Sequence, residues 1–426
     1  MDKQETDEKK VLKTRSRDVE WMGTLYGTAI GAGILFLPLQ AIKSGILSLI
    51  LATIFIYPMV YFSHKALARI SLLADDEHVG LTGSFIQFLG KSGGMVANII
   101  YFLCTFSIMV GYALALPKTL ISLFEVFGWQ GSTALDNSAS SKALFGLIIM
   151  VILVGVMLVG RNFVIKVTTI IIFPLLICLI IICVLLIPHI SIMDVSMGAF
   201  TWRGFIAGCL TIFPILFFAV NHSPTISEFA TSYRDEIKDK KLLLKKVSKV
   251  LTHSNILINA FTLVFVYVVI LALPDAKALA INEANPNLNV TGIIAMIYQT
   301  GLLHYLGPII AICAIISSFF GTFFGTRESL VALLKQIFKM NHKLADTITI
   351  IFLFLILWYL TISNIAILNV LGLLTAPLIA IMVFLLPIIV IYKNKEFQEY
   401  RNKGMTTFLL ISGFIVILGY FIGNML

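Results

Sequence analysis

Eleven apolar runs constrain the fold of this sequence more than any motif in it. They span 19–40, 44–70, 93–118, 142–160, 163–187, 203–228, 247–273, 304–334, 345–361, 363–391 and 405–424. A helix needs about 20 mostly apolar residues to cross a bilayer. Hydrophobic residues make up 59% of the 426 residues and charged ones 12%, whereas soluble domains carry about 25% charged residues. The sequence therefore predicts an all-α integral membrane protein with eleven transmembrane helices, and excludes a soluble enzyme or a disordered chain.

The basic residues fall on alternate sides of successive runs. If each run crosses the membrane once, all but five of the 31 Lys and Arg lie on one side. The five are Lys43, Lys118, Lys142, Arg203 and Lys277. Cytoplasmic loops carry the excess of Lys and Arg, so we predict a cytoplasmic N-terminus and an external C-terminus. This clustering in loops also explains the net charge of +9 without a nucleic-acid partner.

Glycines interrupt the first run, which contains LYGTAIGAGILFLP with Gly27, Gly31 and Gly33. Each glycine costs a helix about 1 kcal/mol relative to alanine, so we expect the helix to unwind there. The alternative is a packing face, because Gly27 and Gly31 are four residues apart, as in the GxxxG motif.

Prolines interrupt the sixth run, in which Pro214 and Pro224 flank Asn221-His222-Ser223. Each proline removes a backbone donor, so a second break is expected, although an ordinary kink is the alternative. The two runs are five apart and cross in opposite directions. Two interrupted helices at corresponding positions of inverted halves indicate a transporter binding site.

Three segments resemble the hydroxy and aromatic amino-acid permeases, and most closely the bacterial serine/threonine symporters: GTAIGAGILFLPLQA, FFAVNHSPTISEFA and SFFGTFFGTRESL. The resemblance implies a LeuT-like fold with a tail at 1–18, inverted five-helix repeats at 19–187 and 203–391, and an eleventh helix at 405–424. It also implies ion-coupled import of an amino acid across the bacterial inner membrane by a monomer without a cofactor. A sensor or exchanger on this fold, or a permease for an aromatic amino acid, is the alternative.

The resemblance and the chemistry of an amino acid together define a substrate site. Amide groups at the break of the first run would bind the carboxylate, helped by a tyrosine of the third run. Carbonyl oxygens of both breaks would bind the ammonium, and the polar trio of the sixth run would recognise a hydroxyl. The predicted residues are Thr28, Ala29, Gly31, Ala32, Gly33, Tyr112, Ala219, Asn221, His222 and Ser223. No second histidine or acid is expected beside His222, whose alternative role is a structural hydrogen bond to backbone that Pro224 frees.

The eighth run departs from the serine/threonine branch, which usually reads KSF-x-GHY there and is regarded as proton-coupled. This chain has Ser317 and Thr322 in place of the titratable lysine and histidine. The resemblance to LeuT-like sodium sites implies a Na⁺ site of neutral oxygen ligands, formed by Gly27, Ile30, Ala314, Ser317 and Ser318. We therefore expect Na⁺ ahead of H⁺ as the coupling ion. The alternative is Lys166, which could stand in for the ion in a proton-driven mechanism.

Overall fold

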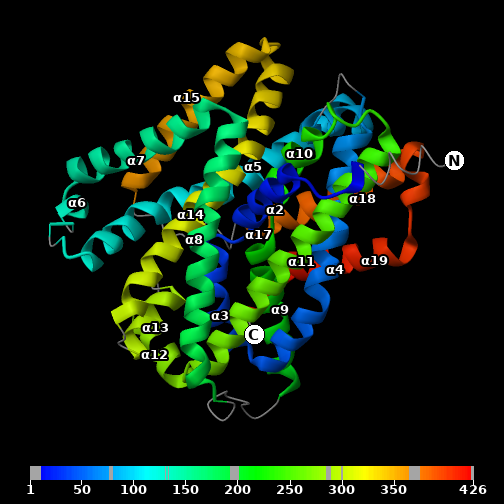
Figure 1. Cartoon of the computed structure of the whole chain (residues 1–426). Coiled ribbons are helices and arrows are strands. Elements are labelled where there is room, and N and C mark those ends of the chain that lie inside the picture. The colour runs from blue at the N-terminus through cyan, green and yellow to red at the C-terminus, as the bar shows by residue number, and fades with distance from the viewer. Residues whose placement is uncertain are drawn as a thin grey trace.

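A computed structural model of the chain describes residues 11–75, 80–129, 131–132, 134–191, 201–284, 289–298, 301–363 and 375–423, which are almost entirely helical (Figure 1). The first part contains α2 (Ser16–Ala29), α3 (Ala32–Ser44), α4 (Ile46–Leu73), α5 (Gly80–Val126), α6 (Ala134–Asn137), α7 (Ala139–Val159), α8 (Arg161–Leu186) and η2 (Ile187–His189). The second part contains α9 (Trp202–Val220), α10 (Ser223–Ser232), α11 (Lys240–Ala272), α12 (Asp275–Ala284), α13 (Val290–Tyr298), α14 (Gly301–Phe338), α15 (His342–Ile362), α17 (Ala376–Ala380), η5 (Ile381–Leu385), α18 (Leu386–Lys393), η6 (Lys395–Tyr400) and α19 (Lys403–Gly423).

Local sequence sets where several of these helices begin. The side chains of Ser138, Thr201, Asp239 and Asn341 each accept a hydrogen bond from the backbone amide three residues further on. Such caps satisfy amide groups that have no partner within the helix. Inside α5, Gly90 has a φ of +80° and bends the helix just before the predicted run 93–118. Glycine adopts this left-handed conformation without steric cost.

The helices agree with a membrane-spanning architecture. Among the described residues, nine helices are long and apolar enough to cross a membrane, and α2 with α3, bent by 51°, would form a tenth. Residues 364–374, in the predicted run 363–391, lie outside the described part of the chain. The predicted run 405–424 coincides with α19, whose apolar part at 403–419 is shorter. The all-α membrane fold is confirmed, whereas the count of eleven spans and the repeat boundaries stay predictions.

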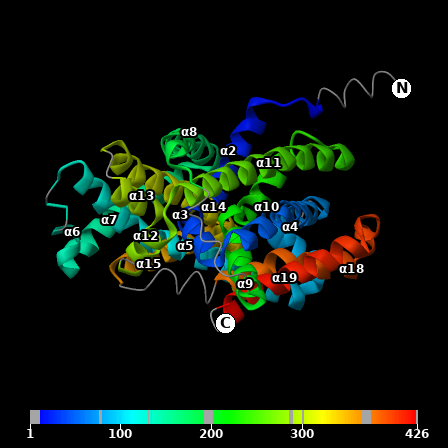
Figure 2. The ribbon, with the colours of Figure 1, turned by 90° about the horizontal axis from the view of Figure 1, so that it is seen from below.

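The two interrupted helices lie at the centre of the bundle. In both ribbon views α3 and α14 occupy the middle, with α6 and α7 at one edge and α18 and α19 at the other (Figure 1, Figure 2). The central helix α14 packs against α2, α5, α8 and α10, and α3 packs along α9. The breaks of the first and sixth predicted runs are therefore brought together beside α14.

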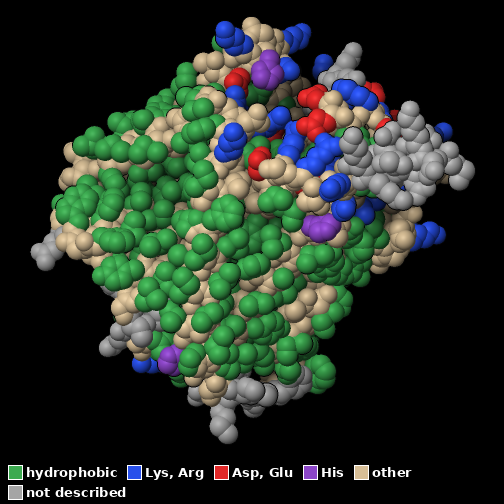
Figure 3. Space-filling view, viewed as in Figure 1, with side chains coloured by type: hydrophobic (Ala, Val, Ile, Leu, Met, Phe, Trp, Pro, Cys, Tyr) green, Lys and Arg blue, Asp and Glu red, His purple; other side chains and the backbone are tan. Residues whose placement is uncertain are grey.

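The face of the molecule seen in Figure 3 is mostly apolar. Val151 and Ile152 of α7, Ile170 and Phe173 of α8, and Tyr359 of α15 are each more than half exposed, as expected for side chains that face lipid. Figure 3 shows that hydrophobic side chains cover most of this face, while Lys and Arg gather near the end of α10 and the start of α2. We call this the basic end. Its assignment to the cytoplasm stays a prediction.

Candidate functional site

The first predicted break lies between α2 and α3. The helix α2 ends at Ala29, Ile30 leaves the helical region with φ −82° and ψ 78°, and α3 begins at Ala32 after Gly31 (φ −109°, ψ −148°). The Ile34 amide bonds back to the Gly31 carbonyl at 3.3 Å. The amide groups of Ala32 and Gly33 belong to the first turn of α3, where an N–H group has no intrahelical partner. They therefore form a site with partial positive charge at mid-bundle.

The second predicted break lies between α9 and α10. Asn221 (φ −77°, ψ 122°) and His222 (φ −124°, ψ 20°) separate the two helices, and Pro224 stands in the first turn of α10. The Asn221 Oδ1 atom accepts a hydrogen bond from the Ser223 amide at 3.2 Å. Proline lacks an amide hydrogen, but in the first turn of a helix that hydrogen would have no intrahelical partner. A helix can therefore start at this position.

The two breaks touch each other. A Cβ atom built on Gly33 would lie 2.8 Å from the Cα of Ala219, so only glycine permits this approach. The hydroxyls of Thr28 and Thr225 are 2.8 Å apart, and the Thr225 hydroxyl also lies 3.1 Å from the Gly321 carbonyl of α14. The structure thus places the predicted residues Gly33 and Ala219 in contact, and it pairs Thr28 with Thr225, which the sequence analysis missed.

Tyr112 of α5 reaches the first break. A Cβ atom on Gly31 would lie 2.5 Å from both the Tyr112 hydroxyl oxygen and the Ser318 Oγ atom, and both side chains are buried. Gly31, Tyr112 and Ser318 therefore surround one point. Ser318 lies between the residues predicted for the substrate and those predicted for the ion.

The predicted ion ligands also converge. The Oγ atoms of Ser317 and Ser318 donate to the Gly27 carbonyl at 3.0 and 2.8 Å. Ser317 Oγ lies 3.2 Å from the Ala314 carbonyl as well. Ile30, the fifth predicted ligand, is fully buried in the adjoining break. These groups are neutral carbonyl and hydroxyl oxygens, the type of ligand that hard cations prefer.

Asn221 and His222 are engaged with α4, where the sequence analysis expected no partner. His64 of α4 stacks on the His222 ring with a centroid distance of 4.1 Å, and its Nε2 atom lies 3.1 Å from Asn221 Oδ1. Both rings are completely buried. The expectation that no second histidine accompanies His222 is therefore wrong, because the fold brings together residues 158 positions apart.

Lys166 lies apart from these ligands. It is exposed on α8 and lines a cavity of about 490 Å³ at the basic end, together with Arg17, Trp21 and Arg161. A second cavity of about 330 Å³ adjoins it, since Arg161 lines both and pairs with Glu228 of α10 at 3.0 Å. The larger cavity is lined by α2, α8 and the end of α10, and the smaller one mainly by α14, with α8, α10 and α15 beside it.

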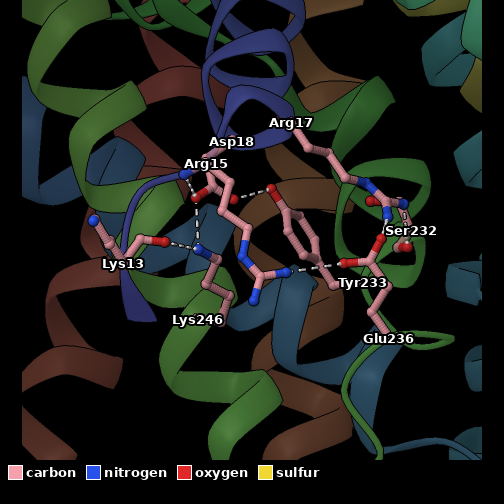
Figure 4. Close-up of polar contacts among 8 residues, drawn as sticks. All are labelled: Lys13, Arg15, Arg17, Asp18, Ser232, Tyr233, Glu236 and Lys246. Carbon is pink, nitrogen blue, oxygen red and sulfur yellow. Dashed lines mark hydrogen bonds and ion pairs between the residues drawn. The ribbon is translucent and has the colours of Figure 1, made fainter. Parts of the chain in front are cut away.

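At the basic end a buried ion pair joins α2 to α11 (Figure 4). The Lys246 Nζ atom lies 2.6 Å from Asp18 Oδ2, and both side chains are 2% exposed. The Tyr233 hydroxyl donates to Asp18 Oδ1 at 2.7 Å. We call Asp18, Tyr233 and Lys246 the latch. Beside it, Arg17 pairs with Glu236 just beyond α10.

The latch is built for a negative charge on Asp18. Besides Lys246 and Tyr233, the Arg15 amide donates to Asp18 Oδ2 at 2.8 Å. Burial, and the hydrogen bond to the Asp18 carboxylate, raise the pKa of the Tyr233 hydroxyl. Tyr233 therefore remains a hydrogen-bond donor at physiological pH. The sequence analysis missed these residues because the chain separates Asp18 from Lys246 by 228 positions.

An all-helical membrane bundle with two broken helices meeting at its centre is the arrangement of many membrane transporters. The sequence matches the tryptophan/tyrosine permease family over residues 21–425, and the chain therefore belongs to this family. It is an amino-acid transporter rather than an enzyme, and a multi-pass protein of the inner membrane. This confirms the resemblance drawn from the three sequence segments.

Relatives agree with this assignment, and a solved structure shares the fold. The serine transporters SdaC of Shigella flexneri and of Escherichia coli K12 are each 28% identical over 417 residues, covering 96% of this chain and 95% of the relative. The crystal structure of MhsT in complex with L-phenylalanine matches with a TM-score of 0.61 at 13% identity, covering 96% of this chain and 98% of that chain. This match shows the LeuT-type fold.

Proposed function

We propose that this protein imports a small neutral amino acid of the serine/threonine type by alternating access, and that a cation gradient drives the import. The observation that carries the proposal is the contact between the two breaks, with Gly33 against Ala219 and Thr28 beside Thr225. The names of the two serine transporters support the substrate class.

The breaks offer opposite polarity to the two charged groups of an amino acid. The carboxylate is assigned to the amides of Ala32 and Gly33 and to the Tyr112 hydroxyl, since the start of a helix favours an anion. The ammonium is assigned to the Thr28 hydroxyl and to carbonyls at the end of α2 and near Ala219. Both groups are costly to remove from water unless they are hydrogen-bonded, so complementary backbone is required.

The side chain of the substrate is assigned to the second break. Ser223 and the polar groups of Asn221 and His222 could recognise a hydroxyl. The contacts of Asn221 and His222 with His64 favour an indirect role for these two, in which they fix the backbone that meets the substrate.

Sodium is proposed as the coupling ion ahead of the proton. Ser317 and Ser318 already bond the Gly27 carbonyl, and rotation of their hydroxyls would present three oxygens to a cation. A proton needs a group that titrates, and Lys166 lines the cavity at the basic end, whereas the side chains nearest Gly27 are Ile172 and Ser317. Because Gly27 and Thr28 are neighbours, ion binding and substrate binding would order the same end of α2.

Alternating access would move α2 at the basic end, which we assign to the cytoplasm. The latch ties α2 to α11, and Arg17 ties it to the segment after α10. Release of these contacts would open the cavities beside α8 and α10 toward the breaks.

A permease for an aromatic amino acid is the second candidate, and the family description together with the phenylalanine complex of MhsT favours it. A thermal-stabilisation screen of the purified protein against the twenty amino acids separates the two. We expect serine and threonine to give the largest shifts; shifts by tryptophan, tyrosine or phenylalanine alone would reject the serine/threonine assignment.

Saturable counterflow of labelled serine in proteoliposomes tests transport itself. We expect serine trapped inside to accelerate entry of labelled serine. Binding without counterflow would favour a sensor, whereas counterflow without net uptake under any ion gradient would favour an exchanger.

A further inference from the structure

His64 lies behind the second break and has no place in the substrate or ion sites assigned above. Its side chain projects from α4 and is completely buried. On one side its Nδ1 atom lies 2.9 Å from the Val60 carbonyl, one turn earlier on α4. On the other side its Nε2 atom faces the two residues that separate α9 from α10.

The Nε2 atom bonds the break in either tautomer. When Nε2 carries the proton, it donates to Asn221 Oδ1 at 3.1 Å, and Nδ1 accepts from the Ser63 hydroxyl at 3.1 Å. When Nδ1 carries the proton, it donates to the Val60 carbonyl, and Nε2 accepts a hydrogen bond from the His222 amide at 3.3 Å. Asn221 Oδ1 is fixed as an oxygen because it also accepts from the Ser223 amide at 3.2 Å.

The ring of His64 also supports the ring of His222. The centroids are 4.1 Å apart and the planes make an angle of 30°. His222 Nδ1 lies 3.1 Å from the Val220 carbonyl, while among the described residues its Nε2 has no hydrogen-bond partner. Contact with His64 is therefore a main constraint on the His222 side chain.

We propose that His64 is a positioning residue that holds the break between α9 and α10 in the conformation that binds substrate. Backbone outside a helix leaves amide and carbonyl groups that must be satisfied at membrane depth. His64 satisfies part of this requirement from a neighbouring helix and fixes Asn221 and His222 in one geometry. A break fixed before substrate arrives avoids an ordering cost on binding. This functional consequence rests on the proposed amino-acid site.

Two substitutions separate positioning from simple packing. In His64→Gln the side-chain amide nitrogen occupies the position of the imidazole Nε2. In His64→Asn the side-chain amide nitrogen occupies the position of Nδ1. His64→Gln therefore keeps a group that bonds the break, whereas His64→Asn keeps only the bond toward Val60. His253 is an exposed histidine whose Nδ1 lies 2.7 Å from the Lys249 carbonyl. His253→Gln and His253→Asn are matched controls.

The direct readout is amide hydrogen–deuterium exchange in a peptide spanning residues 217–226, measured in the full-length protein without substrate. We expect faster exchange in His64→Asn, by about tenfold as for loss of one buried hydrogen bond, and exchange close to wild type in His64→Gln and in both controls. The reasoning is overturned if His64→Asn exchanges like the wild type, or if both His64 variants exchange equally fast.

The functional readout is the KM and maximal rate of L-serine uptake in proteoliposomes. We expect His64→Asn to raise KM about tenfold with a smaller effect on the maximal rate, and His64→Gln to restore affinity. Equal KM values for the two His64 variants would contradict positioning. Absence of serine uptake by the wild type would instead reject the proposed function, and the exchange measurement would still decide the role of His64.

Discussion

The latch gives the most quantitative prediction, because a buried ion pair there can be broken by an isosteric change. Asp18→Asn removes the negative charge that Lys246 meets at 2.6 Å in a site where both side chains are 2% exposed. Lys246 would keep only neutral acceptors, such as the Lys13 carbonyl at 2.9 Å. Removing one partner of a buried pair costs about 3–5 kcal/mol. We expect about 3 kcal/mol, equivalent to about a hundredfold shift in the unfolding equilibrium.

The assay is the free energy of unfolding in increasing SDS, compared across a double-mutant cycle. Replacing both partners, Asp18→Asn with Lys246→Met, is expected to cost less than Asp18→Asn alone, because no charge is left buried and the amide oxygen at position 18 still accepts from the Tyr233 hydroxyl. Glu228→Gln is the matched control: its pair with Arg161 is 28% and 40% exposed, and such pairs contribute under about 1 kcal/mol. If Asp18→Asn costs no more than Glu228→Gln, the assignment of a strongly coupled latch is wrong.

Three further outcomes follow from the same geometry. Gly31→Ala places a Cβ 2.5 Å from Ser318 Oγ, so the protein should fold but lose thermal stabilisation by serine; a normal shift would contradict the substrate site. Ser318→Ala should raise the sodium concentration for half-maximal uptake about tenfold, whereas Ser329→Ala, on the same helix, should leave it unchanged. The pKa of the Tyr233 hydroxyl is raised above its ordinary value of 10.0. The hydroxyl therefore stabilises the fold fully below about pH 10, and this contribution is lost as the pH rises further. The free energy of unfolding, measured from pH 8 to 11, should fall more steeply for the wild type than for Tyr233→Phe.

The breaks could be predicted from sequence because their causes are local. Gly31 and Gly33 weaken a helix through backbone entropy, and Pro224 removes an amide donor. The observed interruptions at 30–31 and 221–222 lie at Gly31 and two residues before Pro224, respectively. The convergence of Ser317 and Ser318 on the Gly27 carbonyl could be anticipated through the resemblance to LeuT-like transporters.

Contacts between distant segments could not be predicted in this way. In the sequence His64 is a single polar residue within an apolar run, and its partner His222 lies 158 residues further along the chain. Asp18 and Lys246 likewise belong to separate charged segments. Only the packing of α4 against α10, and of α11 against α2, brings these side chains together.

The central claim is that an inward sodium gradient drives amino-acid uptake through the site where the breaks meet. The direct measurement is uptake of labelled L-serine into proteoliposomes under an imposed sodium gradient, with equal pH on both sides. We predict transient accumulation above equilibrium in the wild type and none in Gly31→Ala. Uptake that is indifferent to sodium but stimulated by a proton gradient would contradict the assignment of the ion, and identical uptake by wild type and Gly31→Ala would contradict the assignment of the site.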